Sequence, residues 1–228
     1  MHELEDRIKY TFNNRGLLDE ALTHRSFGTP NNERLEFLGD AVLNLVIGRY
    51  LFEQHRDLPE GELTRVRSVL VDQDGLTRIS KDLDLGGYLQ LGAGEHKTGG
   101  SNRPSILSDA VEALFGAIYI DSGFDAVERV IKYLYSSYLE NTDPRELSKD
   151  PKTKLQEFLQ GMRIGLPDYQ VVDILGEAHD QEFVVECRVA TFEVVARGNG
   201  RSRRSAEQEA ARLTYKLIAE QEGLREHE

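Results

Sequence analysis

The strongest constraint on the fold of this chain is an apolar segment, residues 31–51, that carries two acids on one face. Its apolar positions wrap most of the way round a helix, which is typical of a helix enclosed by a fold. Glu36 and Asp40 lie four residues apart in it, so their side chains project from one face. Acids are rarely buried unless they are paired or bound to metal. The segment therefore predicts a helix whose two like charges require a cation.

A second segment, residues 105–122, repeats this combination. It is apolar nearly all round and carries Asp109 and Glu112, three residues apart. If the two acidic faces meet, four carboxylates converge. No His or Cys accompanies them at ligand spacing, which favours Mg²⁺, with Mn²⁺ as a substitute, over zinc. Because bound Mg²⁺ activates water and stabilises charge on a phosphoryl group, the pattern fits phosphodiester hydrolysis.

The alternative is that these acids pair with nearby bases and only stabilise the fold. The available bases are Arg34, Arg49 and Arg103. Burying two acid pairs without a function is costly, but spacing alone leaves both interpretations open. Glu33 lies one turn before Glu36 and next to Arg34, so a salt bridge or a role at the helix start is as compatible with its position as catalysis.

The rest of residues 1–142 has helical periodicity, which predicts an all-α domain. The expected elements are two short helices within residues 3–22, one long helix from the turn at Pro59 to Leu83, and a last helix over 124–140. Residues 91–100 are expected to form a flexible loop. This loop lacks the Lys-Ser/Thr ending of a phosphate-binding P-loop, which argues against a nucleotide site.

The periodicity changes after residues 143–149, a polar segment that predicts a linker. A helix start at Asp150-Pro151 is followed by three expected strands and a capping-box pattern at Ser205. Residues 150–222 thus predict a small α+β domain of the order α-β-β-β-α, with a tail at 223–228. The strands are expected at 169–175, 183–189 and 192–197, and the inner face of the last helix at Ala206, Ala210, Leu213 and Leu217.

A basic segment, residues 197–204, contains four arginines and no acid. It precedes a helix N-terminus, where backbone N–H groups and the helix dipole favour phosphate. The formal net charge of −12 argues against a polyanion partner, but such an edge can bind one locally. A solvated charge run is the alternative, and the position at a capped helix start favours phosphate binding.

Three further features bear on the compartment. No apolar run approaches the roughly 18 residues of a membrane span, and the N-terminal residues lack the pattern of a signal peptide. Cys187 is the only cysteine, which excludes intrachain disulfides. In the second expected strand it alternates inward, as a buried apolar side chain rather than a nucleophile. We therefore expect a cytoplasmic protein without a membrane partner.

Two acidic motifs carry a resemblance to a known family. The segment Asn32-Glu33-Arg34-Leu35-Glu36-Phe37-Leu38-Gly39-Asp40-Ala41 resembles the signature of bacterial ribonuclease III, and residues 109–116 resemble its second acidic motif. Residues 152–157, 176–183 and 198–211 resemble a double-stranded-RNA-binding domain, so the resemblance covers essentially the whole chain. It implies a homodimeric, Mg²⁺-dependent endonuclease of double-stranded RNA without a small-molecule cofactor. The implied products carry 5′-phosphates, 3′-hydroxyls and short 3′ overhangs, and the implied substrates are ribosomal RNA precursors and some messenger RNAs.

The resemblance also implies roles for single residues. Metal would be bound by Glu36, Asp40, Asp109 and Glu112, of which Asp40 and Glu112 would be most critical for catalysis. Phe37 would be an apolar knob at the dimer interface, and Glu60 an accessory acid, a role also open to Glu33. RNA would be contacted by Gln156, Glu157, His179, Ser202, Arg203 and Arg204. The Arg203-Arg204 pair departs from the Lys-Lys common in such domains; charge is kept, although Arg and Lys are not interchangeable.

Two other functions compete with this one. In the first, the helical domain is only a dimerisation scaffold and the chain binds RNA without hydrolysis. Acids at all four positions argue against this function, since a scaffold has no reason to bury them. In the second, the chain is a helical nucleotide pyrophosphohydrolase, a class that also clusters acids around Mg²⁺. The appended RNA domain argues against that function.

Overall fold

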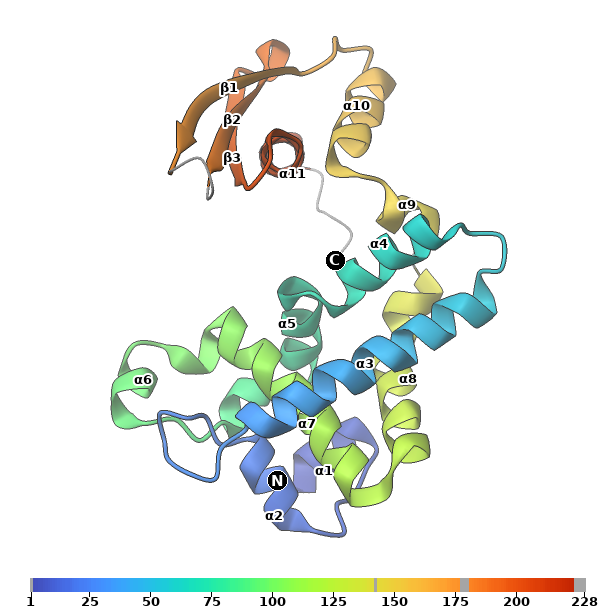
Figure 1. Ribbon diagram of the computed structural model, residues 1–228, viewed down its shortest axis with the longest axis vertical. Helices are drawn as coiled ribbons and strands as arrows, with labels where there is room; N and C mark the ends of the chain where they lie inside the picture. The colour runs from blue at the N-terminus through green and yellow to red at the C-terminus, as the bar shows by residue number, and fades with distance from the viewer. Residues whose placement is uncertain (1, 142, 177–180, 224–228) are drawn as a thin grey trace. The chain divides into compact units, whose positions relative to one another are not determined.

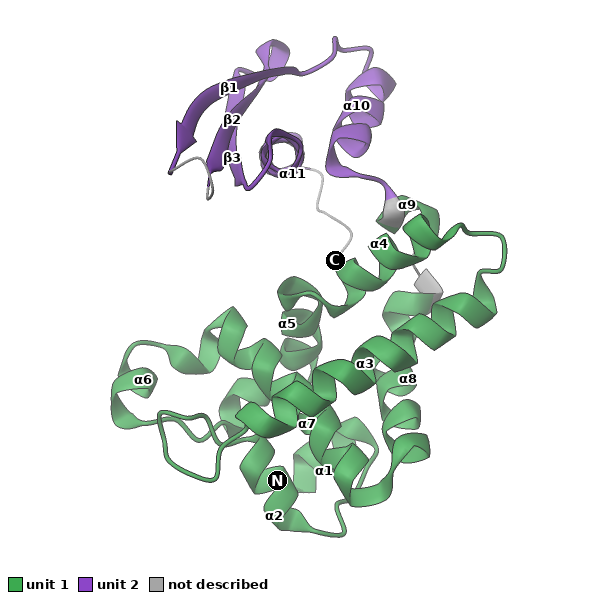
Figure 2. Cartoon of the chain, viewed as in Figure 1, with its two compact units in different colours: residues 1–148 green, residues 149–228 purple. Residues whose placement is uncertain are grey.

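The computed structural model describes residues 2–141, 143–176 and 181–223. The chain divides into two compact units, residues 1–148 and 149–228 (Figure 2). The described part of the first unit is helical, and the second combines helices with a three-stranded sheet (Figure 1). The predicted fold class is therefore confirmed. Among the described residues, no helix has both the length and the apolar character needed to cross a membrane.

The elements of the first unit are α1 (His2–Ile8), α2 (Arg15–Ala21), α3 (Glu33–Gln54), α4 (Glu60–Val71), α5 (Gln73–Asp82), η1 (Leu85–Tyr88), α6 (Ala93–Lys97), η2 (Gly100–Asn102), α7 (Pro104–Ser122), α8 (Phe124–Asn141) and α9 (Pro144–Ser148). The two acidic segments of the sequence form α3 and α7, which pack against each other in the middle of the unit (Figure 1). Helix α7 is buried on nearly every side, as predicted.

Two glycines let the backbones of α3 and α7 touch. A Cβ added to Gly39 would lie 1.8 Å from the carbonyl oxygen of Glu112, and one added to Gly116 would lie 2.1 Å from the carbonyl oxygen of Leu35. Any larger residue at either position forces the helices apart. The contact directly adjoins the acids of both helices, so it determines how closely their side chains approach.

Helix α3 is not enclosed on every side in the single chain, contrary to the prediction. Phe37, Leu45 and Phe52 are 82%, 57% and 72% exposed. They are spaced eight and seven residues apart, which places them along one face of the helix. The opposite face carries the fully buried Leu43 and Ile47. The apolar circumference thus combines a core face with an exposed apolar face.

The expected single helix between Pro59 and Leu83 is two helices, so that prediction was wrong. The chain is extended at Asp72, whose side chain accepts a hydrogen bond of 2.7 Å from the backbone N–H of Gly75 and caps α5. A local cap therefore interrupts a continuous apolar periodicity. The expected loop at 91–100 likewise contains the short helix α6 and the start of η2.

Helix α9 lies within the segment predicted to be a linker. It contacts α4 within the first unit, and Arg145 pairs with Asp57 at 2.5 Å. Part of the polar segment is thus folded against the helical unit. The exact limits of the predicted domains stay a prediction.

The second unit has the predicted α-β-β-β-α order. Its elements are α10 (Pro151–Gly161), β1 (Asp168–Leu175), β2 (Glu182–Val189), η3 (Ala190–Phe192), β3 (Val194–Gly200) and α11 (Arg203–Gln221). The sheet is antiparallel in the order β1-β2-β3, with Cys187 opposite Tyr169 on one side and Ala196 on the other. Cys187 is a free, fully buried thiol, as predicted.

Helix α11 begins three residues earlier than the sequence pattern indicates. Ser202 is the N-cap, and its side chain and that of Ser205 form a reciprocal capping box. Leu217 is 41% exposed, so its predicted inward position was wrong. Thr214 and Ile218 are buried instead, since the helix presents them to the sheet.

Candidate functional site

Three acids from the α3–α7 crossing converge. Glu36, Asp109 and Glu112 are partly buried, and each offers a carboxylate oxygen within 4.8 Å of the others. Oxygens at this spacing suit a hard divalent cation, which accepts carboxylate ligands and retains water. The donor set therefore fits Mg²⁺ or Mn²⁺, and the resemblance-based expectation of a metal here agrees with the chemistry of the residues present.

The electrostatics of the cluster also favour a bound cation. Burial, and then the negative charges of Asp40, Glu36 and Asp109, raise the pKa of Glu112 to about 8. Burial is also the largest cause that raises the pKa of Glu36 and of Asp109. Without a cation these carboxyls resist simultaneous ionisation, because each lies among like charges in a partly dry site.

Asp40 is exposed and lies outside the group of three. Its charge is nevertheless the largest electrostatic influence on the pKa of Glu112, after burial, so it adjoins the cluster. Its Oδ1 accepts a hydrogen bond of 2.8 Å from the side-chain amide of Asn44. Sequence reasoning missed Asn44, although its position one turn after Asp40 was a usable signal.

Two of the three bases proposed as structural partners pair with other acids. Arg103 pairs with Glu95, and Arg49 pairs with Glu53 and Glu128. Among the ion pairs of the described residues, none involves Glu36, Asp40, Asp109 or Glu112. The interpretation of the four acids as salt-bridged structural residues therefore has no support in the described part of the chain.

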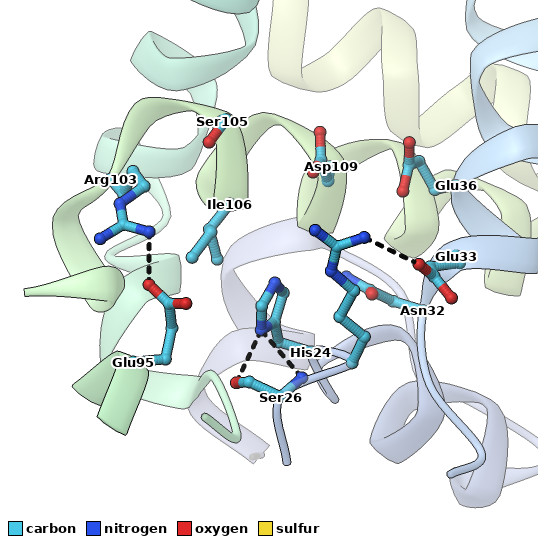
Figure 3. Close-up of a pocket in the computed structure, with 11 residues that line it drawn as sticks. His24, Ser26, Asn32, Glu33, Glu36, Glu95, Arg103, Ser105, Ile106 and Asp109 are labelled. Atoms are coloured by element: carbon cyan, nitrogen blue, oxygen red, sulfur yellow. Dashed lines mark hydrogen bonds and ion pairs between the residues drawn. The ribbon is translucent and has the colours of Figure 1, made fainter. Parts of the chain in front are cut away.

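A pocket of about 510 Å³ opens beside the cluster. Glu36 and Asp109 line one part of it, and the loop that carries His24 and Ser26 lines another (Figure 3). The remaining lining residues include Arg25, Glu33, Glu95 and Arg103. Sequence reasoning missed the loop residues, whose only signal is a pair of basic residues shortly before the acidic helix.

Glu33 contacts this basic loop rather than its neighbour Arg34. It pairs with Arg25 at 3.5 Å, and its carboxylate accepts a hydrogen bond of 3.3 Å from the side-chain amide of Asn31. It is not part of the group of three acids. The sequence left open a salt bridge, a role at the helix start and catalysis for Glu33; the structure shows a salt bridge, made with Arg25, and places Glu33 at the first position of α3.

Glu60 is not part of the three-acid group, and Phe37 directly follows Glu36 on α3. Glu60 accepts a hydrogen bond of 2.8 Å from Thr64 and lines a separate pocket of about 370 Å³ with Asn44, Phe52 and Arg67. Phe37 projects from the exposed face of α3.

The candidate RNA contacts of the second unit are exposed on α10 and at the start of α11. Gln156 and Glu157 lie on α10, and Glu157 pairs with Lys149 at 2.6 Å. Arg203 donates to Glu207 at 2.8 Å, while Arg204 is exposed. Glu207 also pairs with Lys152 at 2.6 Å, a network that sequence reasoning missed. His179 lies outside the described residues.

Two family models match the chain. Residues 14–139 match Ribonuclease-III-like proteins, and residues 151–218 match the double-stranded RNA binding motif. Curated relatives named ribonuclease 3 include the following two. The one from Thiobacillus denitrificans is 54% identical over 209 residues, which cover 92% of each protein. The one from Bordetella avium is 54% identical over 210 residues, which cover 92% of this chain and 84% of the relative.

Solved structures agree for the first unit. A crystal structure of the nuclease domain of ribonuclease III from Campylobacter jejuni is 42% identical, with a TM-score of 0.60, and covers 63% of this chain and 98% of its own. A second structure of that domain, described for flexibility in a region involved in dimer formation, is 43% identical with a TM-score of 0.58 over 59% and 95% of the two chains. With both family models matched in this order, the chain belongs to the ribonuclease III family of double-stranded-RNA endoribonucleases.

Proposed function

We propose that the chain cleaves double-stranded RNA with Mg²⁺, for which Mn²⁺ can substitute, held by Glu36, Asp40, Asp109 and Glu112. The observation that carries this proposal is the approach of three carboxylates to within 4.8 Å of one another. When bound, the metal supplies an activated water and stabilises charge on the scissile phosphate. The products are RNA ends with 5′-phosphates, 3′-hydroxyls and short 3′ overhangs.

Each acid of the site has a proposed role in metal binding or catalysis. Glu112, whose pKa is raised to about 8, gives up its proton when the cation arrives, because a metal ligand must be ionised. Asp40 and Asn44 both lie on α3, and the hydrogen bond from the amide of Asn44 orients the carboxylate of Asp40. Asp40 would then serve as the fourth ligand. Asp40 and Glu112 are the residues on which catalysis depends most. Glu60 is a candidate accessory acid, and Glu33 acts through its pair with Arg25.

A second copy of the chain is the proposed partner of the exposed face of α3. Phe37, Leu45 and Phe52 together present more apolar surface than an isolated exposed side chain does. A related nuclease domain from Campylobacter jejuni has a region involved in dimer formation, which supports the same behaviour here. A two-fold dimer would bury both copies of this face at once, with Phe37 as an apolar knob at the interface.

The second unit is proposed to bind the RNA duplex. Ser202, Arg203 and Arg204 lie at the N-terminus of α11, where backbone N–H groups and side-chain charge both favour phosphate. Gln156 and Glu157 are proposed to contact one minor groove from α10, and His179 a neighbouring one. Duplex RNA is recognised largely by shape through such contacts, which gives binding with little sequence preference.

The proposed setting is the cytoplasm, with ribosomal RNA precursors and some messenger RNAs as substrates. We propose that the chain acts without a membrane partner and without a small-molecule cofactor. The proposed architecture is a catalytic and dimerisation domain at 1–142, a linker at 143–149, an RNA-binding domain at 150–222 and a tail at 223–228.

The decisive experiment is incubation with a long RNA duplex and Mg²⁺. We expect the parent chain to cut the duplex and Glu112→Gln to lose cleavage while still binding it. Asp6→Asn, which changes an exposed acid of α1, is the matched control and should cut normally. Binding without cleavage by the parent would support the scaffold function instead. Turnover of free nucleoside triphosphates with the duplex untouched would support a pyrophosphohydrolase.

A further inference from the structure

We propose that Arg25 binds the backbone phosphate next to the one that is cleaved, and that Glu33 holds the guanidinium at the pocket when RNA is absent. The inference rests on the proposed nuclease function. It adds a phosphate subsite, formed by the loop between α2 and α3, to the metal site on α3 and α7.

The position of Arg25 supports this subsite. The pocket of about 510 Å³ is lined by two acids of the metal cluster, Glu36 and Asp109, and also by Arg25. The loop that carries His24 and Ser26 thus lines the same pocket as these two acids (Figure 3). A strand whose scissile phosphate lies at the cluster can therefore extend along the basic loop.

The backbone of the loop is held in place. The N–H of His24 donates to the carbonyl oxygen of Gln90 at 3.0 Å, and the N–H of Gly92 donates to the hydroxyl of Ser26 at 2.9 Å. A Cβ on Gly92 would lie 2.2 Å from the carbonyl oxygen of Ser26, so the two segments are in direct contact. Residues on both sides of Arg25 are thus anchored, which reduces the entropy lost when its side chain binds a ligand.

Arg25 is better placed than Arg103 to exchange partners. Arg103 pairs with Glu95, whose side chain is only 20% exposed, and also donates to Thr98. The pair of Arg25 with Glu33 is long, at 3.5 Å, and its side chains are 71% and 53% exposed. Exposed pairs of this kind contribute little stability. A phosphate can accept two parallel N–H bonds from the guanidinium, whereas Glu33 makes only one long contact with it, so a phosphate can replace Glu33 as the partner.

Glu33 should increase the effect on RNA binding of removing Arg25. With Arg25 removed, its carboxylate stays at the pocket without this counter-charge and repels an incoming phosphate. Arg25→Ala should therefore weaken RNA binding more than the double variant Arg25→Ala/Glu33→Gln does.

The test measures binding in a Glu112→Gln background with Mg²⁺, using a duplex with one defined cleavage site. Each phosphate flanking that site is replaced in turn by a neutral methylphosphonate. With Arg25 present, one replacement should weaken binding about tenfold, the effect of losing a hydrogen bond to a charged group. Arg25→Ala should bind the unmodified duplex about tenfold more weakly than the Arg25 chain does, and the same replacement should then weaken its binding no further. Arg25→Lys should keep part of the sensitivity to that replacement.

Arg129→Ala, which changes an exposed arginine of α8, is the matched control and should behave as the parent does. An unchanged melting temperature for Arg25→Ala would show that the fold is intact, as its exposure predicts. Equal sensitivity of the parent and Arg25→Ala to every methylphosphonate would overturn the inference. Cleavage by the parent chain would leave the nuclease function standing in that case, whereas failure of the parent to cut would refute the function itself.

Discussion

The carbonyl oxygen of Glu112 occupies the space that a side chain on Gly39 would need, 1.8 Å from an ideal Cβ. Gly39→Ala must therefore separate α3 from α7. We expect a destabilisation of about 3 kcal/mol, at the upper end for overpacked cores, together with weaker Mg²⁺ binding. Thermal unfolding with and without Mg²⁺ measures both effects. Gly94→Ala is the control, because no atom lies within 4 Å of the added Cβ; equal melting temperatures for the two variants would contradict the close contact.

The pKa of Glu112 predicts a pH-dependent stability without metal. The pKa rises from 4.5 to about 8 on folding, so between these values the folded state binds a proton that the unfolded state has released. Stability should therefore fall as pH rises through this window. Glu112→Gln should flatten the profile of melting temperature against pH measured in a chelator. A parent profile as flat as that of the variant would show that the pKa is ordinary.

Metal binding should show the complementary pH dependence. Below pH 8 the cation must displace the proton of Glu112, so Mg²⁺ affinity should rise by up to about tenfold per pH unit. Mg²⁺ should also raise the melting temperature, since it binds the folded acid cluster. Titration calorimetry in buffers of different ionisation enthalpy measures the released proton directly. The absence of proton release at pH 7 would count against Glu112 as a ligand.

The exposed face of α3 predicts self-association through Phe37. Phe37→Asp should weaken the dimer by at least about tenfold, because it places a charge where apolar surface is buried. Sedimentation over a concentration series gives the dissociation constant. Tyr133→Asp, at a 47% exposed position of α8, should leave it unchanged. If the parent chain sediments as a monomer at every concentration, the proposed dimer is wrong.

The start of α11 predicts the salt dependence of RNA binding. Arg203→Ala/Arg204→Ala removes the two charges proposed to contact phosphate and should reduce the slope of log K against log salt by about 1.8. The parallel change Lys216→Ala, at an exposed position farther along α11, tests whether any lost charge has the same effect. If the double variant keeps the parent slope, the phosphates are bound elsewhere.

Periodicity made the two acidic helices and the α-β-β-β-α order predictable, because regular apolar spacing reports directly on buried faces. It could not separate the core face of α3 from its exposed face, since Leu43 and Phe52 are equally apolar. The break at Asp72 was missed because one side-chain cap there overrides a continuous pattern. The Arg25–Glu33 pair was missed because it depends on how a loop is anchored to residues 90–92.

The glycine crossing of α3 and α7 has a consequence for protein engineering. The spacing of the acids depends on main-chain contact at Gly39 and Gly116. We therefore expect that substitutions in the surrounding core can change stability without changing the distance between the carboxylates. A designer who transfers the cluster to another helical scaffold must therefore copy two small residues as well as the acids. Scaffolds whose helices pack through large side chains would hold Glu36 farther from Asp109 and Glu112 than the 4.8 Å that groups their carboxylate oxygens here.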